Sequence, residues 1–280
     1  MATQTQPTTK KLIDVEKVIA SKNPRLLKWM PRFVLNYIKR IVHQDDINRE
    51  VQQYGHLDPI EYARYVLGEK FHINVTSEGL EHIPPTGGAI LVANHPLGGI
   101  DALALVHELA KRRRDFVFLV NDVLLHLPQM RPIFRGVNTL GKSSASELRS
   151  LHDFFASDKL IVIFPAGLVS RKDARGQIRD LPWRKTFVTQ AKRFRKPVIP
   201  TLIQAPPLSK RFYRIHQWRQ KLGIRANLEL FYLVDEQYRL NNTHIHIVFG
   251  KPLPWHHFDD SKSDRAWAEW MRHYIYTLKS

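Results

Sequence analysis

The stretch AILVANHPLGGID, residues 89–101, predicts a strand, a tight turn and the start of a helix in direct succession. Its first five residues are small or branched and apolar, which is typical of a buried strand. After residue 101, apolar side chains recur at helical spacing. Gly98 and Gly99 allow the chain to turn tightly between the two elements, because glycine has no Cβ. The polar residues of the stretch are therefore expected at the end of a buried strand.

His95 and Asp101 stand on either side of this turn, so one short loop brings an imidazole near a carboxylate. A carboxylate can hold one imidazole nitrogen and raise the basicity of the other, which can then take a proton from a hydroxyl near pH 7. A simpler interpretation exists for each residue. Asp101 would then be an acidic first-turn residue of the helix, and His95 a loop histidine without a chemical role.

Strand-like and helical patterns alternate along the remaining chain, which indicates an α/β fold with helices around one sheet. Residues 205–225 are basic and show no clear period. The expected division is 1–68 for a disordered tail and N-terminal amphipathic helices, 69–255 for the α/β domain, and 256–280 for a C-terminal amphipathic helix packed on it. Strands are predicted at residues 71–75, 89–93, 116–120, 160–164, 198–203, 228–234 and 244–249, and further helices at 24–54, 58–67, 146–156, 183–193 and 267–278.

Composition limits the function. The chain has no cysteine, which excludes disulfides and thiol chemistry. Its formal charge of +17 indicates an anionic partner: nucleic acid, an anionic membrane surface or an acidic carrier protein. No apolar run approaches the roughly 20 residues of a spanning helix, and the polar N-terminus lacks the apolar core of a secretion signal. The default expectation is a cytoplasmic protein.

The N-terminal segment 24–54 is amphipathic. Apolar residues recur at steps of three and four, basic residues fall between them, and Pro31 should kink the helix or restart it. A basic amphipathic helix that carries Trp29 and Phe33 is typical of a segment lying flat on an anionic bilayer. The alternative is a helix that packs its apolar face on the core of the same protein.

Residues 136–143, GVNTLGKS, match the P-loop pattern, in which backbone amides cradle phosphates. Residues 230–236, LFYLVDE, also resemble a strand that ends in metal-positioning acids. However, the four residues before the motif, PIFR, make a poor central strand because proline and arginine interrupt it. A P-loop NTPase remains the alternative function.

Other site classes have weaker support. His244 and His246 alternate on a predicted strand near His256 and His257, but the 14 histidines are scattered and no metal site is expected. The basic residues are spread over many elements, and no zinc-finger or aromatic RNA-binding signature occurs, so nucleic acid is not the expected partner. The Gly-x-Ser-x-Gly motif of a serine nucleophile is also absent.

Three blocks in order resemble the lysophospholipid (glycerolipid) acyltransferase family: residues 94–101 (NHPLGGID), 164–171 (FPAGLVSR) and 198–200 (VIP). The resemblance covers about residues 75–205. Five residues separate His95 from Asp101 where the family usually has four, and Ala166 stands where it usually has glutamate. These departures resemble a branch with haemolysin-like proteins and acyltransferases for lyso-ornithine or lyso-glycine lipids.

The resemblance implies a glycerolipid acyltransferase fold with a mixed, largely parallel central sheet. It also implies an O-acyltransferase that moves an acyl chain from acyl-CoA or acyl carrier protein to the hydroxyl of a lyso-lipid, lysophosphatidic acid or a lyso-amino-acid lipid. In this scheme His95 is the general base and Asp101 orients it, with no metal and no cofactor besides the thioester co-substrate. The family's middle block corresponds to residues 133–142, where Arg135 and Lys142 are both candidates for the head-group cation.

The implied partners are an anionic membrane surface at the cytoplasmic face, the lyso-lipid acceptor and an acyl carrier protein, without nucleic acid. A non-catalytic lipid-binding protein is a further alternative. Backbone amides of the 165–167 turn are the expected donors to the developing oxyanion. The predicted substrate-binding residues are Asn94, Arg135, Asn138, Lys142, Phe164, Pro165, Gly167, Ser170, Arg171 and Lys172.

Overall fold

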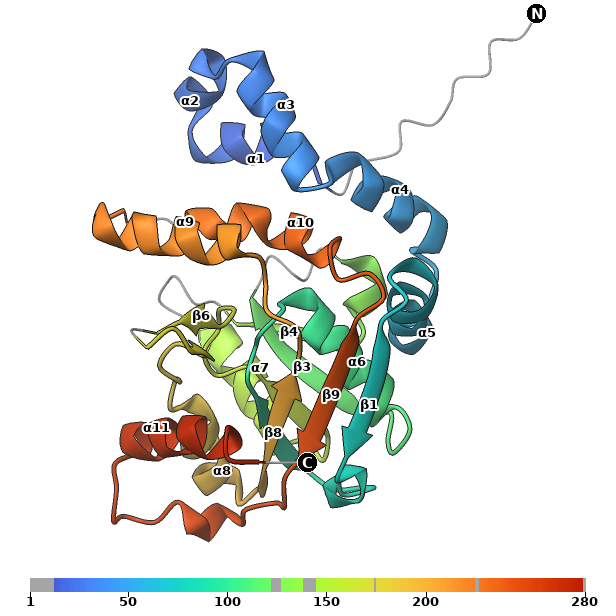
Figure 1. Cartoon of the computed structure of the whole chain (residues 1–280). Coiled ribbons are helices and arrows are strands. Elements are labelled where there is room, and N and C mark those ends of the chain that lie inside the picture. The colour runs from blue at the N-terminus through green and yellow to red at the C-terminus, as the bar shows by residue number, and fades with distance from the viewer. Residues whose placement is uncertain (1–12, 122–126, 138–144, 174, 225–226, 279–280) are drawn as a thin grey trace, which may run out of the picture.

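A computed structural model describes residues 13–121, 127–137, 145–173, 175–224 and 227–278. Within these ranges, seven strands form one sheet in the order β1-β9-β8-β2-β5-β3-β4 (Figure 1). β8, β2, β5, β3 and β4 are mutually parallel, and β9 runs antiparallel to β8 and parallel to β1. The predicted mixed, largely parallel sheet is confirmed. The strands are β1 (Asn74–Glu78), β2 (Ala89–Ala93), β3 (Phe116–Asn121), β4 (Phe134–Val137), β5 (Leu160–Ile163), β8 (Val198–Gln204) and β9 (His244–Phe249).

Helices cover both faces of the sheet, and the central strands are accordingly apolar throughout. Every residue of β2 and β5 is buried, as expected for parallel strands that are covered on both sides. Alternate residues of β2 belong to two separate apolar clusters. One face is covered by α5 (Pro59–Arg64) and α6 (Gly99–Leu109), and the other by α7 (Ala145–Ala156), α8 (Thr186–Phe194) and α11 (Asp264–Ile275).

The N-terminal helices lie at one end of the sheet, beyond α9 and α10 (Figure 1). The break predicted at Pro31 is confirmed, and a second break follows at His43, which has a left-handed backbone conformation. Contacts between Tyr37 and Tyr232, whose hydroxyls are 3.0 Å apart, join this layer to the rest of the protein. The N-terminal helices are α1 (Val15–Lys22), α2 (Pro24–Trp29), α3 (Arg32–Ile41) and α4 (Gln44–Tyr54). The two helices between them and the sheet are α9 (Lys210–Lys221) and α10 (Leu233–Gln237).

Three predicted elements differ from the structure. Residues 228–234 form the 3₁₀ helix η5 (Leu228–Tyr232) and the start of α10 instead of a strand. The exposed residues Leu228 and Phe231 are three positions apart, which fits a 3₁₀ helix and not the alternation of a strand. Glu229 between them is buried and pairs with Arg171. Residues 205–225, which show no clear period, contain α9. The first strand begins at Asn74, because Phe71 ends the π-helical turn η1 (Tyr65–Lys70) and packs in the core.

The correction at 228–234 also bears on the P-loop alternative. Asp235 and Glu236, expected to end a metal-positioning strand, lie in α10 and pair with Arg211. Gly136 and Val137 belong to β4, which pairs with β3 at the edge of the described sheet. The rest of the motif, residues 138–143, lies outside the described residues. In the part of the chain that is described, no helix has the length and apolarity needed to cross a bilayer.

Candidate active site

The predicted site residues follow the carboxyl ends of neighbouring parallel strands. His95 follows β2 and Phe164 follows β5, and these two strands pair directly. Because carboxyl ends of parallel strands meet at one edge, both residues are brought to the same end of the sheet. β4 ends at this edge too, three strand spacings or about 14 Å from β2.

The turn after β2 places the imidazole of His95 against the carboxylate of Asp101. His95 Nδ1 lies 3.0 Å from Asp101 Oδ2. The same oxygen accepts the backbone N–H of Leu97 at 2.8 Å and of Gly98 at 2.9 Å. Gly98 has φ +83° and ψ −129°, which a residue with a Cβ rarely adopts, and α6 begins directly after it. The glycine therefore lets the loop wrap around its own carboxylate.

Burial and hydrogen bonding act in opposite directions on Asp101, which is fully buried. Burial raises the pKa of Asp101 above its ordinary value, although His95 and the two backbone N–H groups partly offset this. The side chain of His95 is 18% exposed. Because Nδ1 faces the carboxylate, Nε2 is the nitrogen left for a substrate hydroxyl. The arrangement can hold an imidazole as a general base and stabilise its charged form.

The turn after β5 packs an aromatic side chain against this imidazole. The rings of Phe164 and His95 are stacked, with centroids 4.1 Å apart and planes 24° apart. The Gly167 N–H donates to the carbonyl of Phe164, and the carbonyl of Pro165 accepts the Arg184 N–H. Pro165 has no N–H and that of Gly167 is engaged, so the Ala166 N–H remains as the candidate oxyanion donor in this turn.

Asp180 is a buried carboxylate that the sequence did not indicate. Its Oδ1 accepts the backbone N–H of His95 at 3.1 Å and the hydroxyl of Ser170 at 2.6 Å, while Oδ2 accepts Trp183 Nε1 at 2.8 Å. The Ser170 N–H donates in turn to the His95 carbonyl. Burial raises the pKa of Asp180. Asp180 thus joins the turn after β2 to the segment that follows the turn after β5, and it positions the main chain of His95 without a hydrogen bond to its imidazole.

Arg171 belongs to a second buried cluster, centred on Glu229. The guanidinium of Arg171 is 3.0 Å from Glu229, and His216 and Arg219 lie at the same distance from this carboxylate. Arg171 is 3% exposed and Glu229 fully buried. The guanidinium is therefore neutralised inside the protein, and its position lends no support to the predicted contact with a head group.

Replacing Glu229 with glutamine should destabilise the protein by about 3–5 kcal/mol near neutral pH, because Arg171 loses its carboxylate partner inside the protein. Burial raises the pKa of Glu229, but its own backbone N–H, His216 and Arg171 outweigh burial and lower it below 4.5. A lowered folded-state pKa gives stability that is present above the ordinary pKa and is lost as the pH falls through the folded value. Urea unfolding at decreasing pH should therefore show the two proteins converging below 4.5. A difference that stays constant with pH would contradict this.

The other predicted substrate-binding residues fall into three groups. Asn94 is buried and bridges β2 to β8, exchanging two hydrogen bonds with the backbone of Ile203. Lys172 is half-buried, 5.3 Å from the ring centre of Tyr213. Arg135 is exposed on β4, where it donates to backbone carbonyls of its own segment. Asn138 and Lys142 lie outside the described residues, so the choice between Arg135 and Lys142 stays open.

Arg184 is an exposed cation at the site that sequence reasoning missed. Its guanidinium lies beside Gly167, 3.8 Å from where a Cβ on that glycine would stand. The signal was weak in the sequence because Arg184 follows the family-like block by more than ten residues, and its backbone bond to Pro165 brings it back.

The chain is similar to known acyltransferases. The family model described as "Acyltransferase" matches residues 17–280. The chain belongs to this acyltransferase family and is an enzyme of that class.

The lyso-glycine lipid O-acyltransferases of Bacteroides thetaiotaomicron and Phocaeicola vulgatus are each 36% identical to it over 271 residues. These alignments cover 95% of this chain in both cases, and 97% and 95% of the relatives. The crystal structure of the 1-acyl-sn-glycerophosphate (LPA) acyltransferase PlsC from Thermotoga maritima superposes with a TM-score of 0.50 at 15% identity, over 95% of each chain. The predicted family and fold are confirmed.

Proposed function

We propose that this protein transfers a fatty acyl chain from an acyl thioester to the hydroxyl of a lyso-amino-acid lipid, by general-base catalysis at His95. The observation that carries the proposal is the placement of His95 Nδ1 3.0 Å from the buried carboxylate of Asp101, at the carboxyl edge of the sheet. The two lyso-glycine lipid O-acyltransferases that share 36% identity with the chain support the acceptor class.

In the proposed reaction, His95 Nε2 takes the proton of the acceptor hydroxyl. The oxygen attacks the thioester carbonyl, and a tetrahedral intermediate forms whose oxyanion accepts the Ala166 N–H. Collapse of this intermediate breaks the carbon–sulfur bond, and the thiolate leaves with the proton from the imidazolium. Asp101 stabilises the imidazolium between the two proton transfers. Positioned general-base catalysis of this kind contributes about 10²–10⁴-fold to the rate.

The charges of the described residues around the site are compatible with an acceptor that carries a carboxylate. Arg171 is neutralised by Glu229, whereas Arg184 is an exposed cation beside the Phe164–Gly167 turn. We propose that Arg184 binds the head group of the acceptor. A guanidinium forms paired hydrogen bonds with a carboxylate.

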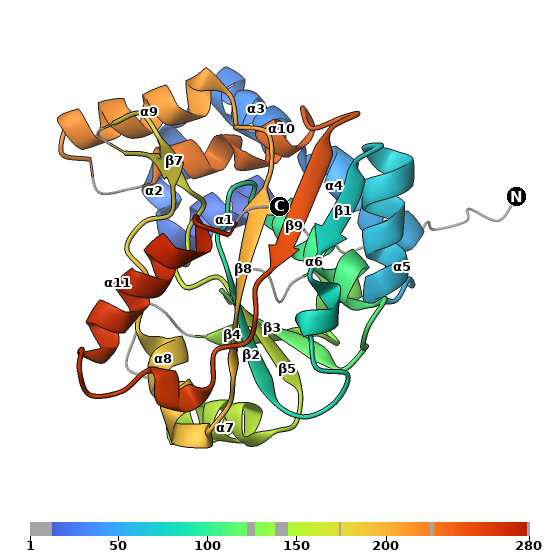
Figure 2. The same ribbon diagram turned by 60° about the horizontal axis from the view of Figure 1, so that its bottom comes forward.

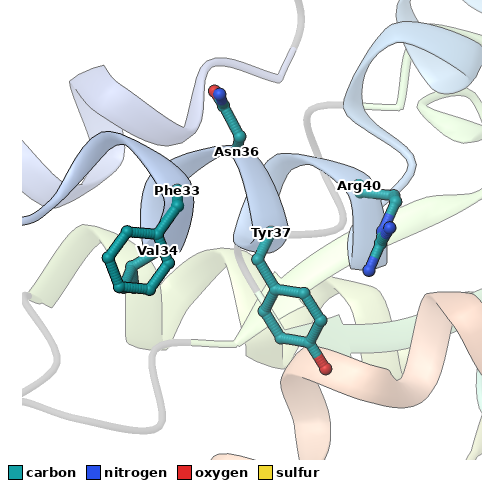
Figure 3. A pocket seen from close by; sticks show the side chains of 5 residues that line it. All are labelled: Phe33, Val34, Asn36, Tyr37 and Arg40. Atoms are coloured by element: carbon teal, nitrogen blue, oxygen red, sulfur yellow. The ribbon is translucent and has the colours of Figure 1, made fainter.

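The N-terminal helices are proposed to hold the enzyme on the cytoplasmic face of an anionic membrane. Trp29 and Phe33 are 84% and 75% exposed, next to basic residues. Phe33, Val34 and Tyr37 project from one side of α3, and a cavity of about 620 Å³ lies along these side chains (Figure 3). An amphipathic helix of this composition binds lipid surfaces through apolar burial and charge together.

The test is an assay of the purified protein with lyso-glycine lipid and with lysophosphatidic acid, each combined with acyl-CoA and with acyl carrier protein as donor. Mass spectrometry of the extracted lipids should show the diacylated glycine lipid as the main product, and the four combinations identify the donor. Lipid binding without a product from any thioester would support a non-catalytic lipid-binding protein. ATP hydrolysis that is lost in Lys142→Ala would support the P-loop alternative.

A further inference from the structure

Two basic segments, far apart in the chain, lie at the same end of the molecule. Residues 24–42 and 205–224 each contain five Lys or Arg and no Asp or Glu. The first segment forms α2 and α3, and the second contains α9. α3 contacts η5, and both views show α9 beside the N-terminal helices (Figures 1 and 2). Lys39, Arg211 and Arg219 are paired with carboxylates, and the remaining cations of the two segments add positive charge to this end of the protein.

The outer side of α9 combines these cations with large apolar side chains. Phe212, Tyr213 and His216 are buried against the protein. On the opposite side the exposed residues recur at helical spacing, and Trp218 and Leu222 are 66% and 70% exposed. The exposed stripe consists of Lys210, Arg214, Trp218, Lys221 and Leu222.

η5 continues the same pattern after the turn. In a 3₁₀ helix, residues three apart share a face. Leu228 and Phe231 are 37% and 52% exposed, whereas Glu229 points inward to Arg171. The hairpin formed by α9 (Lys210–Lys221) and η5 (Leu228–Tyr232) therefore carries large apolar side chains on the outside of both its arms.

This hairpin is attached to both catalytic turns. The Glu229–Arg171 ion pair ties η5 to the segment that follows the Phe164 turn. In α10, the Gln237 side chain donates to the carbonyl of Leu97 at 3.3 Å. Leu233 approaches Gly98 so closely that its side chain would be 3.0 Å from a Cβ there. A membrane or partner that binds the hairpin would therefore lie close to the turn that carries His95, because α10 directly follows η5 and contacts this turn.

We infer that the α9–η5 hairpin is a second lipid-contacting element, which binds an anionic bilayer together with α2 and α3 and brings the catalytic edge to the membrane. Tryptophan beside Lys and Arg suits the lipid interface, because the ring and the aliphatic stems lie among apolar groups while the charges meet phosphates. An acidic carrier protein would match the charge but not the wide exposure of Trp218, Leu222 and Phe231. The membrane contact itself does not depend on the proposed function. Only the statement that a catalytic edge is brought to the membrane rests on it.

The first test is the binding of Trp218→Ser/Leu222→Ser to vesicles of phosphatidylcholine mixed with phosphatidylglycerol, measured by co-sedimentation. Both side chains are exposed, so the double variant should fold normally, as circular dichroism can check. Loss of two apolar contacts should weaken binding at least about tenfold. The matched control is Trp255→Ser: Trp255 is 37% exposed in η6 (Trp255–His257), at the end of the sheet away from α9. The control should bind like the wild type.

The second test follows Trp218 itself. In a Trp29→Phe background, the fluorescence of Trp218 is the difference between this variant and one that also carries Trp218→Phe. Bilayers with brominated acyl chains should quench this difference. Arg214→Gln/Lys221→Gln should weaken binding to the mixed vesicles and leave the weak binding to pure phosphatidylcholine unchanged.

Normal vesicle binding by the double serine variant, or unquenched Trp218 fluorescence, would overturn the inference. So would a variant that binds vesicles normally but has lost affinity for an acidic carrier protein. With a short-chain acceptor dissolved below its micelle concentration, the double serine variant should turn over like the wild type. If the wild type itself forms no product but Trp218 is still quenched, the proposed function fails and the lipid contact stands.

Discussion

His95→Ala is expected to lower the rate of acyl transfer by at least about 10²–10⁴-fold while the protein stays folded. In the proposed mechanism the imidazole takes the proton of the acceptor, and alanine has no group that could do so. The fold should survive because the contacts that fix this turn use the main chain of residue 95: its N–H donates to Asp180 and its carbonyl accepts the Ser170 N–H. The measurement is kcat with acyl thioester and lyso-lipid, together with a thermal unfolding curve.

His152→Ala is the matched control, because His152 is an exposed histidine on α7. It should leave the rate unchanged. An H95A protein that is folded and still active would remove the general-base mechanism. A protein that fails to fold would instead mean that the stacking of His95 on Phe164 stabilises the turn more than its main-chain bonds do, and His95→Gln would then separate the two effects.

Asp101→Asn is expected to lower kcat by about 10²–10⁴-fold and to change KM little. Asparagine has nearly the same shape, so its oxygen can still accept the N–H groups of Leu97 and Gly98. It carries no charge, and so it cannot stabilise the imidazolium that forms during transfer. If its amide nitrogen faces His95 instead, the ring takes the tautomer in which Nε2 carries the proton and cannot accept another.

Stability separates this catalytic effect from a folding effect. Burial raises the pKa of Asp101 in the folded protein above the ordinary value of 3.8. The folded state therefore binds the proton more tightly than the unfolded state, and the charged carboxylate lowers the stability of the protein as the pH rises above 3.8. Removing that charge should leave the thermal midpoint at neutral pH equal to the wild type or above it. A fall in kcat with an unchanged or higher midpoint supports the electrostatic role. An unchanged kcat would show that Asp101 is only a residue of the helix N-terminus.

Local patterns allowed the sheet and the proximity of His95 to Asp101 to be predicted from the sequence. The runs of β2 and β5 contain only apolar residues, which indicates strands that are covered on both faces. His95 and Asp101 are only six positions apart, so the turn between β2 and α6 brings them together by local geometry. Pro31 likewise acts locally, because its ring cannot continue the preceding helix.

Residues that act through distant partners could not be predicted in this way. Asp180 reaches His95 across 85 positions in the sequence, and Arg171 reaches Glu229 across 58. Each looks like an ordinary solvated charge until the fold buries it. α9 was missed for a related reason: its buried face contains His216 beside two aromatic residues, and its exposed face mixes cations with Trp218, so apolar periodicity is weak.

The attachment of Asp180 has a consequence for the C-terminal helix. The Asp180 N–H donates to the hydroxyl of Tyr276, and the Asp180 carbonyl accepts Arg272. Both partners come from α11 or the residue directly after it. Deleting α11 would leave the strands of the described sheet in the chain and still remove both of these hydrogen bonds, together with the apolar side chains of α11 that pack on the sheet. Loss of this helix should therefore disturb the turn of His95 through Asp180, which is more than 90 positions from both partners in the sequence.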